Sequence, residues 1–380
     1  MSTVLPAVLG GVAGAVALLM LLVILIHFWM LRRSVPRTAE SSSSDPSPQG
    51  SRSVELPLTV GISYPSDLQG ARCFSLEDLN KATKNFSENN LVGEGNFGEV
   101  YKGLILDMIV AVKRRSASPS QEFVQKVQKL SSIRHRNIVS LLGYCQESNL
   151  QMLIYEYIPN GSISSHLFGT SNTRLEFKHR LSIACRAAKG LAYLHSLNPP
   201  VVHMDFKTAN VLVDENYIPK VADVGLQNFL RRNDGAGPSQ TKAENLFLDP
   251  GVCESRSFTD KSDVYSFGVF LLELVSGTEA SQLQFTGSNQ GITEWAQDYD
   301  DSSDISALID RRMARSFTDK GLRDLLRLAV WCLNPSAGGR PPMSFVGSEL
   351  DRILDKEMSL TTIMGEGTPT LTLGSELFMS

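Results

Sequence analysis

Two short segments contain side chains that together could carry out phosphoryl transfer. The run Asp205 to Asn210 includes Lys207, and Asp223 follows in an Asp-Val-Gly turn. The Asp205 carboxylate could accept a proton from an attacking hydroxyl, and Lys207 could neutralise charge on the transferred group. Asn210 and Asp223 offer the oxygen ligands that Mg²⁺ prefers. Because loose phosphoryl transfer needs positioning and charge neutralisation more than covalent chemistry, this set could be sufficient for it.

A glycine-rich segment upstream is a candidate phosphate-binding loop. Gly93, Gly95 and Gly98 fit the pattern G-x-G-x-x-G-x-V, and glycine lets a backbone approach phosphates without a Cβ in the way. Dinucleotide-binding folds share the first six positions, but there the motif lies between a strand and a helix. Here it lies between two strand patterns. Lys113 follows in a Val-Ala-Val-Lys run, where its ammonium would bind the α and β phosphates.

These elements, in this order, resemble plant receptor-like serine/threonine kinases of the pelle/IRAK-like group. The resemblance extends from about Phe74 to Leu354 and includes the runs 91–103, 135–145, 154–168 and 261–268. It implies an α+β fold of two lobes, a small β-rich N-lobe and a larger helical C-lobe. It also implies ATP and Mg²⁺ as cofactors, and either protein substrates or partner receptor kinases as binding partners.

The resemblance also assigns a role to each residue of the site. Tyr155 would be the gatekeeper, Glu156 to Ile158 the hinge that pairs with adenine, and Asp263 a brace for the catalytic-loop backbone. Asp205, Lys207 and Asn210 would be catalytic, and Asn210 and Asp223 would bind the metal. The implied ATP-binding residues are Val92, Gly93, Glu94, Gly95, Asn96, Phe97, Gly98, Val100, Ala111, Lys113, Tyr155, Glu156, Tyr157 and Ile158.

One supporting position departs from the family pattern in the helix predicted from about Pro119 to Ile133. That helix should carry a glutamate that pairs with Lys113, but the position holds Lys126. Two ammoniums at about 4 Å would repel each other by several kcal/mol at an intermediate dielectric. Glu122, one turn away, would substitute only if the helix slid or rotated, although a bound ATP could also bridge the two lysines.

The segment that would dock a protein substrate, residues 243–252, is the most altered. Glu244 replaces a threonine that contacts the catalytic Asp and Lys, so it could pair with Lys207 and oppose Asp205. Gly251 replaces a glutamate expected to form a salt bridge with Arg340. Unless Arg340 is exposed or has another partner, it is predicted to be unpaired, and breaking a buried ion pair typically costs about 3–5 kcal/mol.

Two further replacements predict milder effects. Met204 stands where an arginine usually pairs with activation-loop phosphate, which predicts different regulation rather than inactivity. Val224 stands where phenylalanine is usual in the metal-binding turn. It keeps an apolar contact with less volume, which should loosen packing against the regulatory helix.

Residues 4–31 are predicted to cross a membrane. They include no charged residue, and as a helix they would be about 42 Å long, enough for a hydrocarbon layer of roughly 30 Å. A signal peptide would have a shorter apolar core and a positively charged start. Because Arg32, Arg33 and Arg37 follow, the positive-inside rule places the remaining chain in the cytoplasm. We therefore expect a single-pass protein of the plasma membrane without an ectodomain.

The composition along the chain predicts its remaining segments and the bounds of the folded domain. Residues 1–3 are expected outside the cell, residues 32–73 form a polar, disordered juxtamembrane linker, and residues 356–380 a flexible tail. The kinase domain is expected at residues 74–355, with its N-lobe at about 74–158 and its C-lobe at about 159–355. Ser75 and Asp78 predict a capped helix start. Buried helices are predicted around the stripe Leu181 to Leu194 and over Asp263 to Val275.

Charge and cysteine content exclude several classes of function. The formal net charge is −4, so nothing suggests binding to nucleic acid. The five cysteines are scattered without a C-x-x-C pair, which argues against a disulfide framework or a zinc site. Two functions remain: a membrane-anchored receptor-like kinase with weak or conditional activity toward Ser/Thr, or a pseudokinase scaffold that binds active receptor kinases. A small-molecule phosphotransferase lacks support.

Overall fold

The computed structural model describes residues 70–169, 175–230, 246–255, 257–283, 291–299, 304–306, 308–313 and 317–363. All of them belong to one compact unit, Ser66–Ser380. Among these residues, we find no helix whose length and apolar character would let it span a bilayer. The predicted membrane segment 4–31, the linker up to residue 69, the tail from residue 364 and Glu244 lie outside the described residues.

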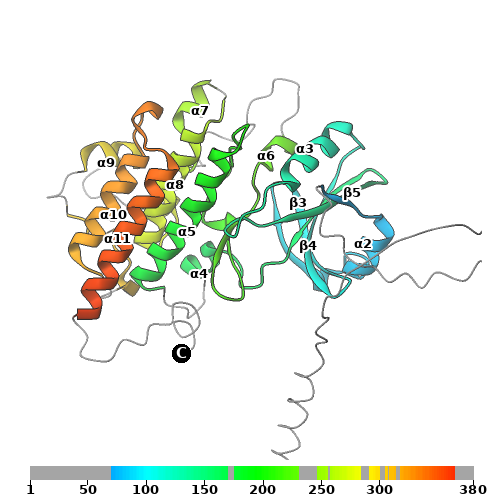
Figure 1. Ribbon diagram of the computed structural model, residues 1–380, viewed down its shortest axis with the longest axis horizontal. Helices are drawn as coiled ribbons and strands as arrows, with labels where there is room; N and C mark the ends of the chain where they lie inside the picture. Colours follow the sequence, from blue (N-terminus) through cyan, green and yellow to red (C-terminus); the bar gives the residue numbers. More distant parts are fainter. Residues whose placement is uncertain are drawn as a thin grey trace, which may run out of the picture. The chain divides into compact units, whose positions relative to one another are not determined.

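A six-stranded sheet and two helices form the N-lobe (Figure 1). The strand order is β1-β5-β6-β4-β3-β2. Neighbouring strands are antiparallel, except that β1 runs parallel to β5. The elements are β1 Arg72–Cys73, α2 Leu76–Thr83, β2 Leu91–Gly95, β3 Gly98–Ile105, β4 Met108–Ser116, α3 Gln121–Ser131, β5 Leu141–Glu147 and β6 Leu150–Glu156.

The register of the sheet places four predicted nucleotide-binding residues on one face. Val100 pairs with Lys113, and Ala111 pairs with Tyr155. Because side chains alternate between faces along a strand, all four project to the same side. The opposite face is buried under α2. The apolar cluster there includes Phe74, Leu79, Val110, Val112, Cys145, Met152 and Ile154.

The C-lobe is helical, apart from a short hairpin that carries the predicted metal-binding turn. In Figure 1 its helices α5, α8, α10 and α11 lie apart from the N-lobe sheet. The described elements are α4 Ile163–Phe168, α5 Phe177–Ser196, β7 Val211–Val213, β8 Pro219–Val221, α6 Gln227–Leu230, α7 Pro250–Ser255, α8 Asp260–Ser276, α9 Ile292–Asp298, α10 Asp319–Cys332 and α11 Met343–Ile363.

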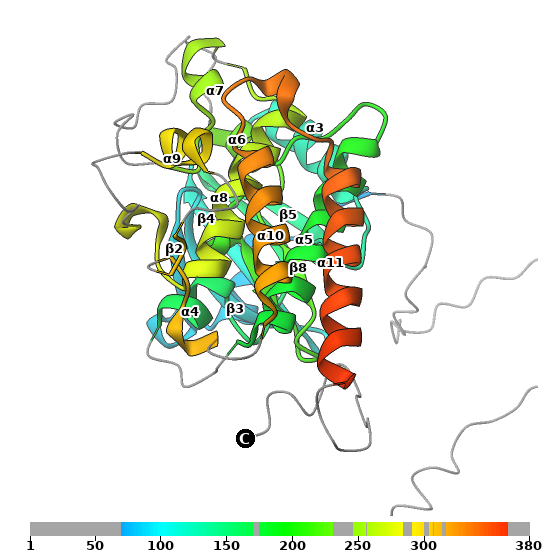
Figure 2. The same cartoon turned by 90° about the vertical axis from the view of Figure 1, so that its left-hand side faces the viewer.

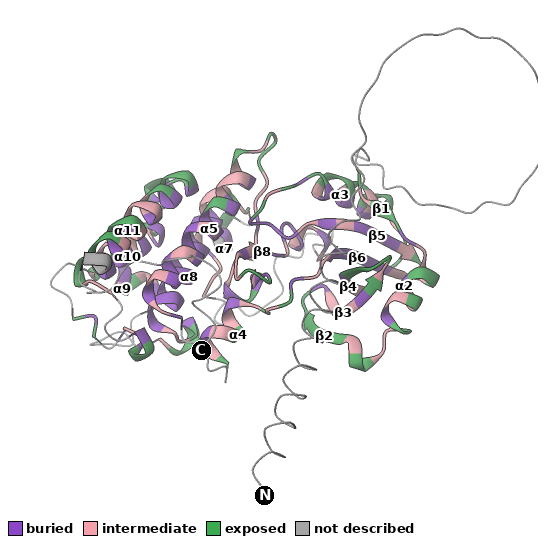
Figure 3. Ribbon diagram, turned by 60° about the horizontal axis from the view of Figure 1, so that its bottom comes forward, coloured by how far each residue is buried: buried purple, intermediate pink, exposed green. Residues whose placement is uncertain are grey.

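Helix α8 is the central helix of the C-lobe. It is buried almost all round, as predicted, and so is the stripe from Leu181 to Leu194 on α5. A capping box of Thr259 and Ser262 begins α8, and Gly277 with a φ of 61° ends it. Helices α5 and α10 pack against α8, while α11 packs along α5 (Figure 2). Buried residues gather on the facing sides of these helices (Figure 3).

The folded domain is longer than predicted at both ends. Strand β1 belongs to the sheet through its pairing with β5, so the linker predicted to end at residue 73 ends before Arg72. At the other end, α11 continues to Ile363, beyond the predicted boundary at residue 355. The Glu357 side chain explains this extension, because it is buried and accepts a hydrogen bond from the Thr318 backbone N–H at 3.1 Å.

The predicted helix start at Ser75 is confirmed. The Asp78 backbone N–H donates to Ser75 Oγ at 3.0 Å, so Ser75 caps α2. The described cysteines, Cys73, Cys145, Cys185 and Cys332, are free thiols.

Gly98 offers a test of the sheet register at the glycine-rich loop. Its φ is 141°, and a Cβ there would lie 2.1 Å from the Arg114 carbonyl oxygen. We expect Gly98→Ala to lower the free energy of unfolding by more than about 1 kcal/mol in denaturant titrations. Gly95→Ala is the control, because nothing lies within 4 Å of a Cβ at Gly95, and it should change stability by less than about 0.5 kcal/mol. Equal effects would show that this register is wrong.

Candidate active site

Asp263, in the first turn of α8, holds the backbone of the predicted catalytic loop. Its side chain is buried and accepts hydrogen bonds from the backbone N–H groups of His203 (2.7 Å) and Met204 (2.9 Å). His195 Nε2 lies 2.8 Å from the same carboxylate. Met204 has a φ of 72°, a left-handed conformation that non-glycine residues adopt rarely. This geometry matches the bracing role that the resemblance implies for Asp263.

Asp205, Lys207 and Asn210 lie together in that loop. Lys207 Nζ is 3.1 and 3.2 Å from the two carboxylate oxygens of Asp205. Asn210 Nδ2 donates to the Asp205 backbone oxygen at 2.7 Å. The amide nitrogen of Asn210 therefore stabilises the curve of the loop, and its amide oxygen is the atom that could bind a cation.

Asp223 is adjacent to Asn210, because the Ala222 backbone N–H donates to the Asn210 carbonyl at 2.8 Å. His203 Nε2 lies 2.8 Å from the Ala222 carbonyl and supports the same turn. The Asn210 and Asp223 oxygens suit Mg²⁺. No cluster of three or more His, Cys, Asp or Glu side chains suited to a metal occurs within the described part of the chain. An ion here would therefore take its remaining ligands from phosphates and water.

An ion pair between Lys113 of β4 and Asp223 joins the two lobes across the site. The two side chains are each 16% exposed. Lys113 Nζ also lies 5.9 Å from the centre of the Tyr155 ring. Tyr155 is buried, which raises the pKa of its hydroxyl above the usual range, so the ring is neutral. Lys113 thus already pairs with the carboxylate that would bind the metal.

Lys126 has partners of its own, so the predicted repulsion between two unpaired ammoniums is relieved. Its Nζ lies 2.6 Å from Glu122, one turn earlier on α3, and donates to the Asn228 carbonyl at 2.5 Å. Glu122 therefore pairs with Lys126 within the helix rather than substituting for the family glutamate beside Lys113.

Arg340 has a partner other than the family's glutamate, which is one of the alternatives left open above. Its side chain is 0% exposed, and its guanidinium binds both carboxylate oxygens of Asp249 at 2.7 and 2.8 Å. It also donates to the Lys261 carbonyl at 2.9 Å. Asp249 was not predicted as the partner of Arg340, because the family pattern places the acidic partner at position 251. The available signal was a carboxylate in the same segment, two residues before Gly251.

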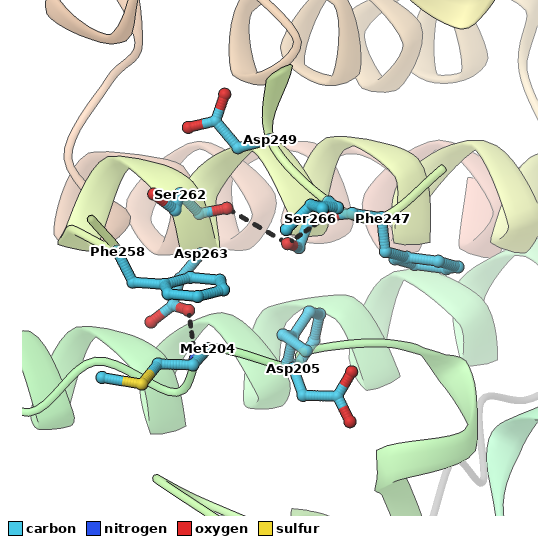
Figure 4. Close-up of a pocket in the computed structure, with 10 residues that line it drawn as sticks. Met204, Asp205, Phe247, Asp249, Phe258, Ser262, Asp263 and Ser266 are labelled. Carbon is cyan, nitrogen blue, oxygen red and sulfur yellow. Dashed lines mark hydrogen bonds between the residues drawn. The ribbon is translucent and has the colours of Figure 1, made fainter. Parts of the chain in front are cut away.

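A small cavity lies beside the described part of the predicted substrate-docking segment, residues 246–252 (Figure 4). Ser266 Oγ donates to the Phe247 carbonyl at 2.7 Å, which fixes the segment on α8. The cavity left there is about 10 Å³, room for one water at most. It is lined by Met204, Asp205, Phe206, Phe247, Leu248, Asp249, Phe258, Ser262, Asp263 and Ser266.

Val224 leaves little empty space, so the loosening predicted there is small. The cavity beside it is about 10 Å³ and is lined by apolar groups of α3, β5 and β6, including Leu130, Leu141 and Tyr155. Because the cost of lost volume in a core grows with the size of the cavity left behind, a cavity of this size implies a small cost.

The glycine-rich loop and the hinge complete the predicted nucleotide site. Val92 to Asn96 are exposed, whereas Phe97 is buried. At the hinge, Glu156 accepts a hydrogen bond from the Ser140 N–H at 2.7 Å and pairs with Lys220 at 2.7 Å. Lys102 lies 4.7 Å from the centre of the Tyr157 ring, and Ile158 is buried. These contacts hold the hinge side chains in place.

Thr208, between Lys207 and Asn210, connects the catalytic loop to a buried acid. Its hydroxyl donates to Glu273 Oε2 at 2.5 Å, and the Ala280 N–H donates to Glu273 Oε1 at 2.8 Å. Burial raises the pKa of Glu273 from 4.5 to about 7. Sequence analysis gave no indication of this group, because Glu273 lies in an otherwise apolar helix.

Comparison with known proteins places this site in a family. A model described as protein tyrosine and serine/threonine kinase matches residues 86–350. The chain belongs to this kinase family. The probable serine/threonine-protein kinase PBL3 of Arabidopsis thaliana is 36% identical over 83% of this chain and 78% of its own length.

Receptor-like proteins are also similar to this kinase. A probable leucine-rich repeat receptor-like protein kinase of Arabidopsis thaliana is 38% identical over 76% of the chain, but the chain spans only 31% of that relative. Among solved structures, the pseudokinase domain of BIR2, described as an immune regulator of the RLK/Pelle family, matches with a TM-score of 0.62. It shares 28% identity over 74% of this chain and 86% of that domain. These matches support a plant receptor-like kinase.

The Asp249–Arg340 pair can be tested by removal and rescue. We expect Asp249→Ala to lower the free energy of unfolding by about 3–5 kcal/mol, because it leaves a buried guanidinium unpaired. A Cβ at Gly251 would lie 3.4 Å from the Asp249 carboxylate. Gly251→Glu should therefore restore part of the loss in the Asp249→Ala background, as measured by urea titration. A loss below about 1 kcal/mol for the single variant would contradict the pairing.

Glu273 should make stability depend on pH. Its pKa is raised in the folded state, so the folded protein binds more protons than the unfolded chain between pH 4.5 and about 7. Stability should therefore fall as the pH rises through that range, by up to roughly 3 kcal/mol. Glu273→Gln, which mimics the protonated acid, should remove this slope in urea titrations from pH 4.5 to 8. The exposed control Glu215→Gln should keep it, and an unchanged slope in Glu273→Gln would contradict the assignment.

Proposed function

We propose that this chain is a membrane-anchored receptor-like kinase that binds ATP and Mg²⁺ and transfers the γ-phosphate to serine or threonine of proteins, with weak or conditional activity. The observation that carries the proposal is the assembly of Asp205, Lys207 and Asn210 next to the Lys113–Asp223 pair. These are the charges and ligands that phosphoryl transfer requires.

Each residue has a defined task in this proposal. Val100, Ala111 and Tyr155 share the sheet face that would cover the adenine, and the backbone of Glu156 to Ile158 would pair with its polar edge. Lys113 would bind the α and β phosphates. Asn210 and Asp223 would hold Mg²⁺, which when bound would neutralise charge on the β and γ phosphates.

Asp205 would act on the substrate hydroxyl. It would accept the proton as the substrate oxygen bonds to the γ-phosphorus and the bond to the β,γ-bridging oxygen breaks, which leaves ADP. Lys207 lies beside Asp205 and would neutralise charge on the phosphoryl group in transit.

A pseudokinase scaffold that binds active receptor kinases is the second candidate. Lys126 and Gly251, which stand in place of two family glutamates, favour it. The structural likeness to the BIR2 pseudokinase domain adds support. In either case we propose anchoring in the plasma membrane through residues 4–31, with the kinase domain in the cytoplasm, on the grounds of the charge-free apolar run and the arginines after it.

Phosphotransfer separates the two candidates. Full-length chain and an Asp205→Asn variant would be incubated with Mg²⁺ and radiolabelled ATP, and the label on the protein measured. We expect slow labelling that falls by at least about 100-fold in the variant, since general acid–base groups contribute roughly 10²–10⁴-fold. Labelling that Asp205→Asn leaves unchanged would contradict catalysis at this site. Thermal stabilisation by ATP and Mg²⁺ without labelling would favour the pseudokinase, and absence of stabilisation would contradict the kinase proposal.

A further inference from the structure

Helix α6, directly after the Asp-Val-Gly turn, is held by two cations of the N-lobe. Lys126 of α3 donates to the Asn228 carbonyl at 2.5 Å, and Arg115 of β4 donates to the Phe229 carbonyl at 2.8 Å. Carbonyls in the last turn of a helix lack intrahelical partners and carry partial negative charge. Two positively charged donors, an ammonium and a guanidinium, therefore stabilise the position of α6.

The contact at Lys126 depends on its departure from the family pattern. A glutamate at this position would have no proton to donate to the Asn228 carbonyl and would repel it. It would also lie one turn from Glu122, a like-charge pair that destabilises a helix. The replacement that removes the expected partner of Lys113 thus provides a donor for α6.

Arg115 extends the connection to the start of α3. Its guanidinium donates to Gln151 Oε1 at 2.5 Å, and Gln151 Nε2 lies 3.2 Å from Gln146 Oε1. That same oxygen accepts from the backbone N–H of Ser120, the N-cap of α3, at 2.9 Å. Gln151 is 2% exposed, so this chain of hydrogen bonds is shielded from water. The positions of α3 and α6 are therefore coupled both at the start of α3, through Ser120, and at its middle, through Lys126.

Phe229 connects α6 to the glycine-rich loop. Its ring packs edge-on against Phe123 of α3 at 5.5 Å and against Phe97 at 6.2 Å between centroids. Phe97 is 3% exposed, although its neighbours from Val92 to Asn96 are exposed. Arg115 also lies 4.7 Å from the centre of the Phe97 ring. The loop that would cover the nucleotide phosphates is thus attached by Phe97 to the start of the activation segment.

We propose that Lys126 is a positioning residue that, with Arg115, holds α6 against α3 in a resting state. In this state Phe229 anchors Phe97 and keeps the glycine-rich loop folded onto the segment after the metal-binding turn. Binding of nucleotide phosphates requires the loop to leave this position, so release of α6 strengthens nucleotide binding. This last step rests on the proposed function, whereas the contact between α3 and α6 does not.

Hydrogen–deuterium exchange of the full-length chain without nucleotide tests the contact itself. In Lys126→Met, backbone amides of residues 95–99 and 224–230 should exchange about tenfold faster than in the unchanged chain, since a hydrogen bond to a charged donor is worth roughly 1.5–3 kcal/mol. Lys126→Arg, which keeps a donor, should retain most of the protection. Lys129→Met, an exposed lysine on the same helix, is the matched control and should change nothing.

Titration with ATP and Mg²⁺ then tests the consequence. Lys126→Met should bind nucleotide about three- to tenfold more tightly than the unchanged chain. Unchanged exchange in Lys126→Met would overturn the contact whether or not the chain binds ATP. Faster exchange with unchanged or weaker nucleotide affinity would overturn the resting-state role of the loop. If the unchanged chain bound no nucleotide, the proposed function would fail while the exchange result still stood.

Discussion

The ion pair between Lys113 and Asp223 is the interaction on which the arrangement of this kinase depends. It joins β4 of the N-lobe to the metal-binding turn of the C-lobe, and both side chains are mostly shielded from water. The sheet register aims Lys113 at the site, and the contact of Ala222 with Asn210 places Asp223 opposite. Because two partly buried charges need partners, separating them is favourable only when other charges replace the lost ones. Phosphates and Mg²⁺ are the charges that would do so.

The replaced family residues have acquired new partners. Arg340 pairs with the buried carboxylate of Asp249, and Lys126 pairs with Glu122 and the Asn228 carbonyl. The same physical rule acts in both cases, since an unpaired buried charge is costly and a nearby group of opposite charge relieves it. The replacements therefore leave neither Arg340 nor Lys126 without a partner.

Local patterns predicted much of the fold. The cap at Ser75 and the apolar α8 depend on residues close in sequence, and the structure contains both of them. Asp205, Lys207 and Asn210 lie together in one loop and Asp223 is adjacent to Asn210, while the roles assigned to them stay predictions.

The missed features depend on contacts between distant residues. Asp249 and Arg340 are 91 residues apart, and Lys126 and Asn228 are 102 apart. The spacing of apolar residues along the sequence does not indicate which distant residues form such pairs. The ends of the domain were missed for a similar reason, because β1 and the last turns of α11 are stabilised by β5 and Thr318 rather than by their own composition.

The metal dependence of nucleotide binding tests whether phosphates and Mg²⁺ replace the partners of Lys113 and Asp223. Calorimetric titration of the full-length chain with ATP, with and without Mg²⁺, would be compared with the same titrations of Asp223→Asn. We expect Mg²⁺ to raise the affinity of the unchanged chain for ATP by about tenfold or more, equivalent to roughly 1.4 kcal/mol. In Asp223→Asn, Mg²⁺ should have little effect on that affinity. Equal ATP affinity with and without Mg²⁺ in the unchanged chain would contradict this replacement.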